Sequence, residues 1–152
     1  MSVPLSRLTL THLVLTLVAA LVLSACLADS GATLAAPAAF DQAKAGSITL
    51  IDIRTPGEWR QTGVAGGAVA INMQDPQGAE GFADKVLAQV KGDRGAPIAL
   101  ICRSGNRSTH MQHALQELGF TRVYNVNEGM GGSAAGPGWI KRGLPVAACK
   151  QC

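Results

Sequence analysis

Cys102 stands at a junction where a sulfur nucleophile would be well placed. The apolar run 98–101 before it is typical of a buried strand, and the polar, glycine-containing stretch after it leads into a predicted helix over 109–118. Backbone N–H groups converge at such a junction, and the positive end of the helix dipole points at it, which favours thiolate over thiol. Arg103 and Arg107 act in the same direction. The pattern predicts a nucleophilic sulfur beside an anion, although a buried cysteine can also simply pack.

Length and composition indicate a single globular domain. The chain has 152 residues, of which 47% are hydrophobic and 15% charged. Its formal net charge of +3 is too weak and too scattered for nucleic-acid binding, and the few aromatic residues leave no stacking platform for bases. We therefore expect no nucleic-acid partner, and at most a local preference for small anions.

The N-terminus has the order of a secretory signal, with Arg7 followed by an apolar run over 13–23 that is short for a membrane-spanning helix. The run ends in Leu-Ser-Ala-Cys, which resembles the bacterial lipobox, where the cysteine is lipidated and becomes the mature N-terminus. This resemblance implies a signal peptide over 1–25 and a lipid on Cys26. It also implies a protein held by that lipid at the membrane, on the periplasmic side of the bacterial cell envelope. Simple cleavage with release, or an uncleaved anchor, are the alternatives.

The remaining chain divides by composition into a flexible tether over 26–37, a domain over 38–146 and a C-terminal tail over 147–152. Helices are predicted over 38–45, from Thr55 through Gln61, over 80–91 and over 109–118, and strands over 47–53, 68–72, 98–101 and 123–126. The glycines between residues 63 and 67 predict a loop, and residues 139–142 a helical turn. Alternating strands and helices predict an α/β fold with a parallel sheet, whose ligands bind at the carboxyl ends of strands, where Cys102 lies.

Four segments carry a family resemblance. They are LIDIRTPGEW over 50–59, Gly67-Ala68-Val69, CRSGNRS over 102–108, and the closing stretch 119–146. In this order they resemble the rhodanese family of sulfurtransferases in its single-domain form. The resemblance implies a rhodanese-like fold, with a central, mainly parallel sheet flanked by helices on both faces. Two stretches depart from the family pattern: Val64-Ala65-Gly66 replaces its usual His-Ile-Pro, and the glycine-rich segment 131–138 is longer and could form a lip near the site.

The same resemblance implies two half-reactions that need no cofactor. The Cys102 thiolate would take the outer sulfur of a small sulfur-oxyanion donor such as thiosulfate, and a thiol or cyanide acceptor would remove it from the resulting persulfide. We expect Arg103 to hold the oxyanion of the donor and Arg107 to brace or line the loop. The other loop residues would contribute mainly backbone donors to the persulfide: Ser104, Gly105, Asn106 and Ser108. Six residues from Cys102 to Arg107 favour sulfur chemistry over the related phosphatases, whose loop is one residue longer.

Other residues that could do chemistry have simpler explanations. Asp52 and Arg54 end a strand and are expected to orient neighbouring loops, and Glu58 fits a capping box with Thr55. His110 and His113 lie three apart on a helix without a third ligand, so they predict a surface face and no metal site. Trp139 is expected in the core or the lip rather than as a substrate platform. A rhodanese-like module that carries sulfur or metal, or docks a redox or other partner without turnover, is the competing hypothesis.

The tail ends in Cys149-Lys150-Gln151-Cys152, a CxxC pair outside any strand–helix context. Three interpretations are open. The pair could form a local disulfide in an oxidising compartment, act as a redox or sulfur-relay arm that removes the persulfide from Cys102, or supply half of a metal site.

Overall fold

The computed structural model describes residues 32–149 and Cys152. The predicted signal peptide over 1–25, the lipid site Cys26 and the first part of the predicted tether lie outside the described residues. Within the described part, no helix has the length and apolar character needed to cross a membrane.

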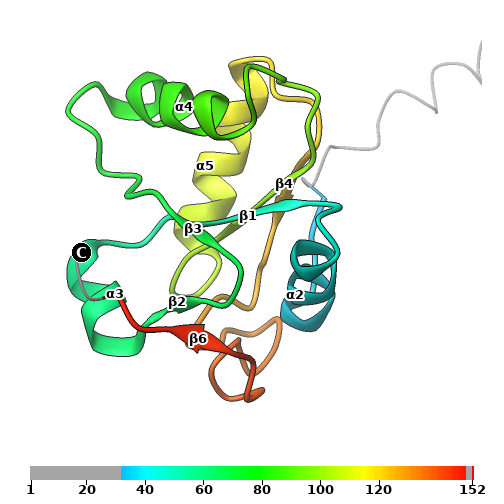
Figure 1. Ribbon diagram of the computed structural model, residues 1–152, viewed down its shortest axis with the longest axis vertical. Coiled ribbons are helices and arrows are strands. Elements are labelled where there is room, and N and C mark those ends of the chain that lie inside the picture. The colour runs from blue at the N-terminus through cyan, green and yellow to red at the C-terminus, as the bar shows by residue number, and fades with distance from the viewer. Residues whose placement is uncertain (1–31, 150–151) are drawn as a thin grey trace, which may run out of the picture. The chain divides into compact units, whose positions relative to one another are not determined.

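A four-stranded parallel sheet forms the centre of the domain, in the order β3-β1-β4-β5 (Figure 1). Its strands are β1 (Thr49–Asp52), β3 (Val69–Ala70), β4 (Ile98–Ile101) and β5 (Val123–Asn125). All four residues of β4 are buried, as expected for a central strand covered on both faces. The expected α/β fold with a mainly parallel sheet is therefore confirmed. β4 has the predicted bounds, whereas β1, β3 and β5 are shorter than predicted.

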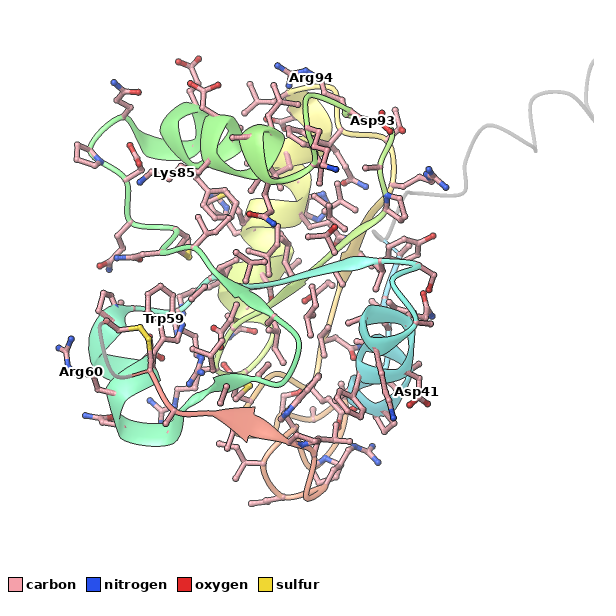
Figure 2. All side chains as sticks on the ribbon, viewed as in Figure 1. Asp41, Trp59, Arg60, Lys85, Asp93 and Arg94 are labelled. Carbon is pink, nitrogen blue, oxygen red and sulfur yellow. A yellow bond between two sulfur atoms is a disulfide. The ribbon has the colours of Figure 1, made fainter. Side chains whose placement is uncertain are left out.

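Helices cover both faces of the sheet, α2 (Ala36–Lys44) on one and α4 (Gly78–Gln89) with α5 (Asn106–Glu117) on the other (Figure 1). Successive strand residues point to opposite faces. In β4, Ile98 and Leu100 therefore join the core under α4 and α5, whereas Ala99 and Ile101 join the core under α2. Charged side chains such as Asp41, Lys85 and Arg94 point outward from these layers (Figure 2).

The described domain is longer at its N-terminal end than the sequence predicts. Ala36 and Pro37, assigned to the tether, belong to α2, because proline is well suited to the first turn of a helix. The Leu34 N–H donates to the Asn125 carbonyl oxygen at 2.9 Å, which continues the sheet edge beyond β5. The ordered domain therefore includes residues that composition alone assigns to a flexible segment.

The C-terminal end also differs from its prediction. Val146–Ala147 forms β6, which pairs antiparallel with β2 (Val64–Ala65) in a second, two-stranded sheet. The sequence predicts a loop and a tail at these places, because two-residue strands are too short to show a hydrophobic period. Residues 139–142 form hydrogen-bonded turns, and the Arg142 N–H donates to the Gly138 carbonyl oxygen at 3.1 Å with the spacing of a single helical turn.

Candidate active site

The loop that follows β4 carries Cys102 and turns directly into α5 at Asn106, three residues before the predicted helix start. Gly105 makes this turn possible, with a φ of +90° that L side chains rarely adopt. A Cβ atom on Gly105 would lie 2.2 Å from the Asn127 carbonyl oxygen, so no larger residue fits there. Glycine therefore allows the chain to pass from strand to helix with Cys102 at the N-terminal end of α5.

The sulfur of Cys102 lies between the apolar core and two hydrogen-bond donors. The Gly105 N–H donates to Sγ at 3.2 Å, and the Ser108 hydroxyl lies 3.3 Å from it. The residue is 1% exposed and packs at the edge of the core that includes Met111. The sequence assigns several loop N–H groups to the sulfur. Among the described residues, the Gly105 N–H donates to Sγ, whereas the N–H groups of Ser104 and Asn106 do not.

Ser108 contributes its hydroxyl, where the sequence predicts mainly its backbone. The hydroxyl has one hydrogen and lies within reach of both Sγ of Cys102 and the Gly105 carbonyl oxygen at 3.0 Å. That carbonyl already accepts from the N–H and the hydroxyl of Thr109, each at 2.9 Å. Because the carbonyl is satisfied without Ser108, the hydroxyl is available to donate to a negatively charged sulfur.

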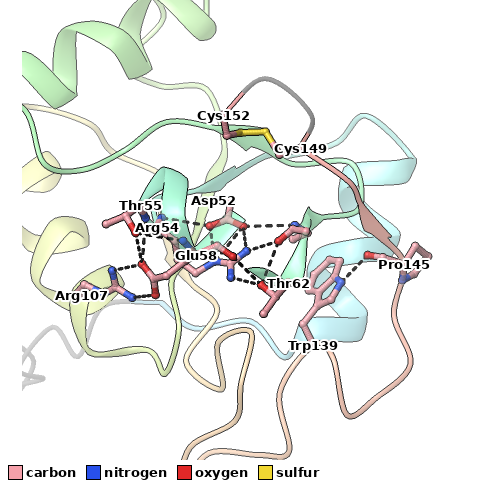
Figure 3. A network of polar contacts seen from close by, with 12 residues as sticks. Asp52, Arg54, Thr55, Glu58, Thr62, Arg107, Trp139, Pro145, Cys149 and Cys152 are labelled. Carbon is pink, nitrogen blue, oxygen red and sulfur yellow. Dashed lines mark hydrogen bonds and ion pairs between the residues drawn. A yellow bond between two sulfur atoms is a disulfide. The ribbon is translucent and has the colours of Figure 1, made fainter. Parts of the chain in front are cut away.

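Arg107 braces the loop through a two-pronged ion pair with Glu58 (Figure 3). Its two guanidinium nitrogens donate to the carboxylate at 2.9 and 2.6 Å, which lowers the pKa of Glu58 from 4.5 to about 2 despite the opposing effect of burial. The pKa of Arg107 is raised, first by this hydrogen bond and further by the negative charge of the Glu58 carboxylate, against the opposing effect of burial. Of the two roles predicted for Arg107, the structure supports bracing.

Glu58 belongs to α3 (Pro56–Thr62), and it also closes the predicted capping box. The Thr55 hydroxyl accepts from the Glu58 N–H, while the Glu58 carboxylate accepts from the Thr55 N–H at 3.0 Å. The capping role was visible in the sequence spacing. The bond to Arg107 was not, because the partners are 49 residues apart and no local pattern connects them. One carboxylate therefore joins the first turn of α3 to the first turn of α5.

Asp52 and Arg54 form a buried ion pair that fixes the other end of α3 (Figure 3). Nε of Arg54 donates to Oδ1 of Asp52 at 2.9 Å, and Nη2 donates to Oδ2 at 2.7 Å. The Arg54 guanidinium also donates to the Thr62 hydroxyl at 2.7 Å and to the Gly63 carbonyl oxygen at 2.6 Å. The expectation that this pair orients neighbouring segments is met.

A cavity of about 270 Å³ lies beside the loop. It is lined by Arg54, Glu58, Gln61, Thr62, Arg103, Met130, Gly131 and Ile140. The charges of Arg54 and Glu58 are paired, whereas Arg103 is exposed and makes no ion pair with any described carboxylate. Arg103 therefore gives the cavity a net positive charge, and its binding of an anion stays a prediction. Cys102 lies outside the cavity lining.

The glycine-rich segment after β5 covers the loop from the other side. The Met130 N–H donates to the Cys102 carbonyl oxygen at 2.9 Å, and the Gly131 N–H donates to that of Arg103 at 2.8 Å. A Cβ atom on Gly129 would lie 2.5 Å from the same Arg103 oxygen, so the two segments are in direct backbone contact. Met130 and Gly131 also line the cavity. The segment predicted as a lip over 131–138 therefore borders the site at Gly131, but the stretch that covers the loop begins earlier, at Gly129. We call residues 129–138 the glycine-rich lip.

Comparison with known proteins agrees with this geometry. Residues 36–135 match the rhodanese-like domain. The chain belongs to this family. A sulfurtransferase of Allochromatium vinosum is 32% identical over 101 residues, which are 66% of this chain and 79% of that protein. The family and this relative support a sulfurtransferase-type role.

Solved structures share the rhodanese-like fold. The structure of Rv0390 from M. tuberculosis is 28% identical, with a TM-score of 0.60 over 78% of this chain and 98% of that one. The polysulfide-sulfur transferase homodimer of Wolinella succinogenes is 25% identical, with a TM-score of 0.58 over 79% of this chain and 80% of that one.

Other candidate residues of this rhodanese-like domain lie away from the loop chemistry. His110 and His113 are exposed on α5, and the described residues contain no cluster of three potential metal ligands. Trp139 is fully buried in the core under α2 and donates its indole N–H to the Pro145 carbonyl oxygen at 2.7 Å.

A disulfide joins Cys149 and Cys152 in the tail of the rhodanese-like domain (Figure 3). The Arg60 guanidinium donates to the Cys152 carbonyl oxygen, so α3 holds the end of the tail. The cavity is lined by α3 residues at positions 58, 61 and 62. At about 100° per residue, Arg60 projects from the opposite side of that helix. The tail is therefore anchored on the side of α3 that faces away from the cavity.

Proposed function

We propose that this protein is a sulfurtransferase that carries sulfane sulfur on Cys102 as a persulfide. The observation that supports this most strongly is the position of Sγ, which lies at the N-terminal end of α5 within reach of the Gly105 N–H and the Ser108 hydroxyl. Fixed donors of this kind stabilise negative charge without reorganising when it forms. The adjacent cavity, with Arg103 as its unpaired cation, supplies a place for an anionic donor.

The chemistry consists of two displacements at sulfur. With thiosulfate, the Cys102 thiolate attacks the outer sulfur, the donor S–S bond breaks, and its electron pair leaves with sulfite. A thiolate acceptor then attacks the outer sulfur of the persulfide, takes that sulfur, and returns Cys102 to the thiolate. No proton has to move, so a general base is not needed. Gly105 and Ser108 stabilise the Cys102 thiolate that starts the first step and is restored by the second, and Arg103 holds the oxyanion of the donor.

Access to the sulfur requires movement of the residues around it, because Cys102 is 1% exposed. Arg103 is exposed and Met130 belongs to the glycine-rich lip, and both border the cavity next to the loop. We propose that movement of these two side chains admits the donor to Sγ. The same burial favours the competing hypothesis, in which the domain carries sulfur or metal, or docks a redox or other partner, without turnover.

Steady-state kinetics distinguishes the two hypotheses. We expect sulfur transfer from thiosulfate to cyanide or to a dithiol in the wild type, and none in Cys102→Ser. Arg103→Gln should raise the KM for thiosulfate about tenfold or more, because it removes a charge-assisted hydrogen-bonding group. Arg122→Gln is the matched control, since that exposed arginine donates to the Gly95 carbonyl oxygen away from the cavity. Equal rates in the wild type and Cys102→Ser would instead favour the non-catalytic module.

For the tail we propose a structural disulfide rather than a relay, since the tail is anchored on the far side of α3. Replacing both tail cysteines by serine should leave the acceptor kinetics unchanged. A large fall in the rate of persulfide removal, with the rate of persulfide formation preserved, would identify the tail as a relay.

For the N-terminus we propose lipidation at Cys26 and anchoring in the bacterial envelope, supported by the Leu-Ser-Ala-Cys sequence after an apolar run. Expression in a bacterium with labelled fatty acid should label the wild type and leave Cys26→Ser unlabelled. Label on neither protein would favour simple cleavage or an unprocessed anchor.

A further inference from the structure

Glu128 is a buried carboxylate that the proposed reaction does not use. Its side chain is 1% exposed, and its oxygens accept three hydrogen bonds. Oε1 accepts from the Ala36 N–H at 2.7 Å, while Oε2 accepts from the Gly138 N–H at 3.0 Å and from Nε of Arg142 at 2.7 Å. Burial raises the pKa of Glu128, but the hydrogen bonds outweigh it and leave the pKa below its ordinary range. The group is therefore held as a carboxylate.

These three bonds fix the glycine-rich lip at both of its ends. Glu128 lies directly before Gly129, where the lip begins, and Gly138 lies where it ends. The bond to Ala36 ties the glycine-rich lip to the first turn of α2, which packs against the central sheet. The lip is therefore attached to the rigid body of the domain through one side chain.

The lip in turn holds the backbone of the loop. The N–H groups of Met130 and Gly131 donate to the carbonyl oxygens of Cys102 and Arg103, and Gly129 packs against the Arg103 backbone. Any displacement of the lip is therefore passed to the peptide unit that carries the Arg103 side chain. Met130, Gly131 and Arg103 also line the cavity together, so the same displacement changes its shape.

We propose that Glu128 is a positioning residue for donor binding, which acts through the glycine-rich lip to place Arg103 and the cavity wall around the oxyanion of the donor. This inference rests on the proposed function for its kinetic readout. It predicts a selective effect. Binding of the anion depends on Glu128, whereas the reactivity of the sulfur with the acceptor does not, because Gly105 and Ser108, which donate to Sγ, make no hydrogen bond to the lip among the described residues.

Glutamine is a disruptive replacement here because of its donor pattern. A carboxylate accepts at both oxygens, whereas an amide accepts at its oxygen and donates at its nitrogen. If the amide oxygen of the new glutamine faces Ala36, its NH₂ group faces the N–H groups of Gly138 and Arg142, and both of those bonds are lost. In the reverse placement the NH₂ group faces the Ala36 N–H, and that bond is lost. Glu128→Gln therefore loses at least one bond of the three while preserving the side-chain volume.

Two milder variants address the same carboxylate without removing it. Arg142→Gln removes the Nε donor, and because a third of that side chain is exposed, the domain should tolerate the change. Gly136→Ala would place a methyl group 2.6 Å from Oε2 of Glu128 and press on the carboxylate from the side. Lys141→Gln is the matched control, since it removes a neighbouring exposed charge that lies outside these contacts.

The test measures the KM for thiosulfate, the KM for the acceptor, and the affinity for sulfite by calorimetry in each variant. We expect Glu128→Gln to raise the thiosulfate KM and the sulfite dissociation constant about tenfold, with the acceptor KM within about twofold of wild type. Arg142→Gln and Gly136→Ala should shift the same two quantities in the same direction, by about threefold, and Lys141→Gln should leave them unchanged.

A merely structural role for Glu128 would lower the melting temperature and the active fraction without changing donor KM or sulfite affinity, and that result would overturn the inference. If Glu128→Gln does not fold, the two milder variants decide the question by the same criteria. If the wild type transfers no sulfur, the proposed function fails, and sulfite affinity still tests the role of Glu128.

Discussion

Replacing Glu58 by glutamine removes one charge from the pair that joins α3 to α5. Glutamine can still accept the hydrogen bond from the Thr55 N–H, so the capping box survives and the variant isolates the interaction with Arg107. The two nitrogen–oxygen distances of 2.6 and 2.9 Å define a two-pronged, charge-assisted contact. Because the pair fixes the first turn of α5, its loss should loosen the helix end that carries Ser108 as well as lower stability.

The pKa of Glu58 gives the size of the effect. A fall from 4.5 to about 2 corresponds to an upper bound of about 3 kcal/mol in the free energy of unfolding. The side chains are 34% exposed for Arg107 and 24% exposed for Glu58, so solvent screens part of this interaction. We expect Glu58→Gln to lower the free energy of unfolding by about 1–2 kcal/mol at pH 7.

Urea denaturation at pH 7 and at pH 3 measures the difference in free energy of unfolding between wild type and Glu58→Gln. The comparison of the two pH values tests whether that difference comes from the charge of Glu58. A carboxylate whose pKa is depressed by folding stabilises the protein fully above its unfolded pKa of about 4.5, and the stabilisation is lost as pH falls towards about 2. The difference between wild type and Glu58→Gln should therefore shrink by about half or more at pH 3. Glu117→Gln, an exposed carboxylate near the end of α5, should change stability by less than about 0.5 kcal/mol at either pH. An equal difference at both pH values, or none at pH 7, would refute the reasoning.

Two further changes test the loop itself. Ser108→Ala removes a donor to Sγ of Cys102 and should slow persulfide formation about tenfold. Ser47→Ala, which removes an exposed hydroxyl bonded to the Gln42 carbonyl oxygen, should have a much smaller effect in the same stopped-flow measurement. Equal losses in the two variants would remove the special role of the Ser108 hydroxyl. Gly129→Ala places a Cβ 2.5 Å from the Arg103 backbone at a φ of +64°, so it should lower both the melting temperature and the activity. Gly57→Ala is the control, because the nearest atoms to a Cβ at this position in α3 are 3.9 Å away, and it should be neutral or slightly stabilising. A similar loss of melting temperature and activity in both glycine variants would contradict the importance of the contact between Gly129 and the Arg103 backbone.

The features that could be predicted from the sequence are those with local signals. An apolar run followed by Cys102 and a glycine identifies the strand, the loop and the helix, because periodicity changes within a few residues. The capping box at Thr55 depends on a spacing of three residues, and it forms as predicted.

The features that were missed depend on contacts between distant segments. Glu58 and Arg107 are 49 residues apart, and Glu128 and Ala36 are 92 residues apart. Each of these glutamates has a local sequence context that fits a solvent-exposed position equally well. The pairing of β2 with β6 involves two residues on each strand, which is too few for a hydrophobic pattern. Such contacts become visible only when the fold brings the segments together.

The central claim is that Cys102 carries sulfur, and intact-protein mass spectrometry after incubation with thiosulfate tests it most directly. We predict that the wild type gains about 32 Da, the mass of one sulfur atom, that added cyanide removes this mass, and that Cys102→Ser shows no gain. A wild-type protein that keeps its original mass with thiosulfate and with other sulfane donors, or a gain that persists in Cys102→Ser, would contradict the account.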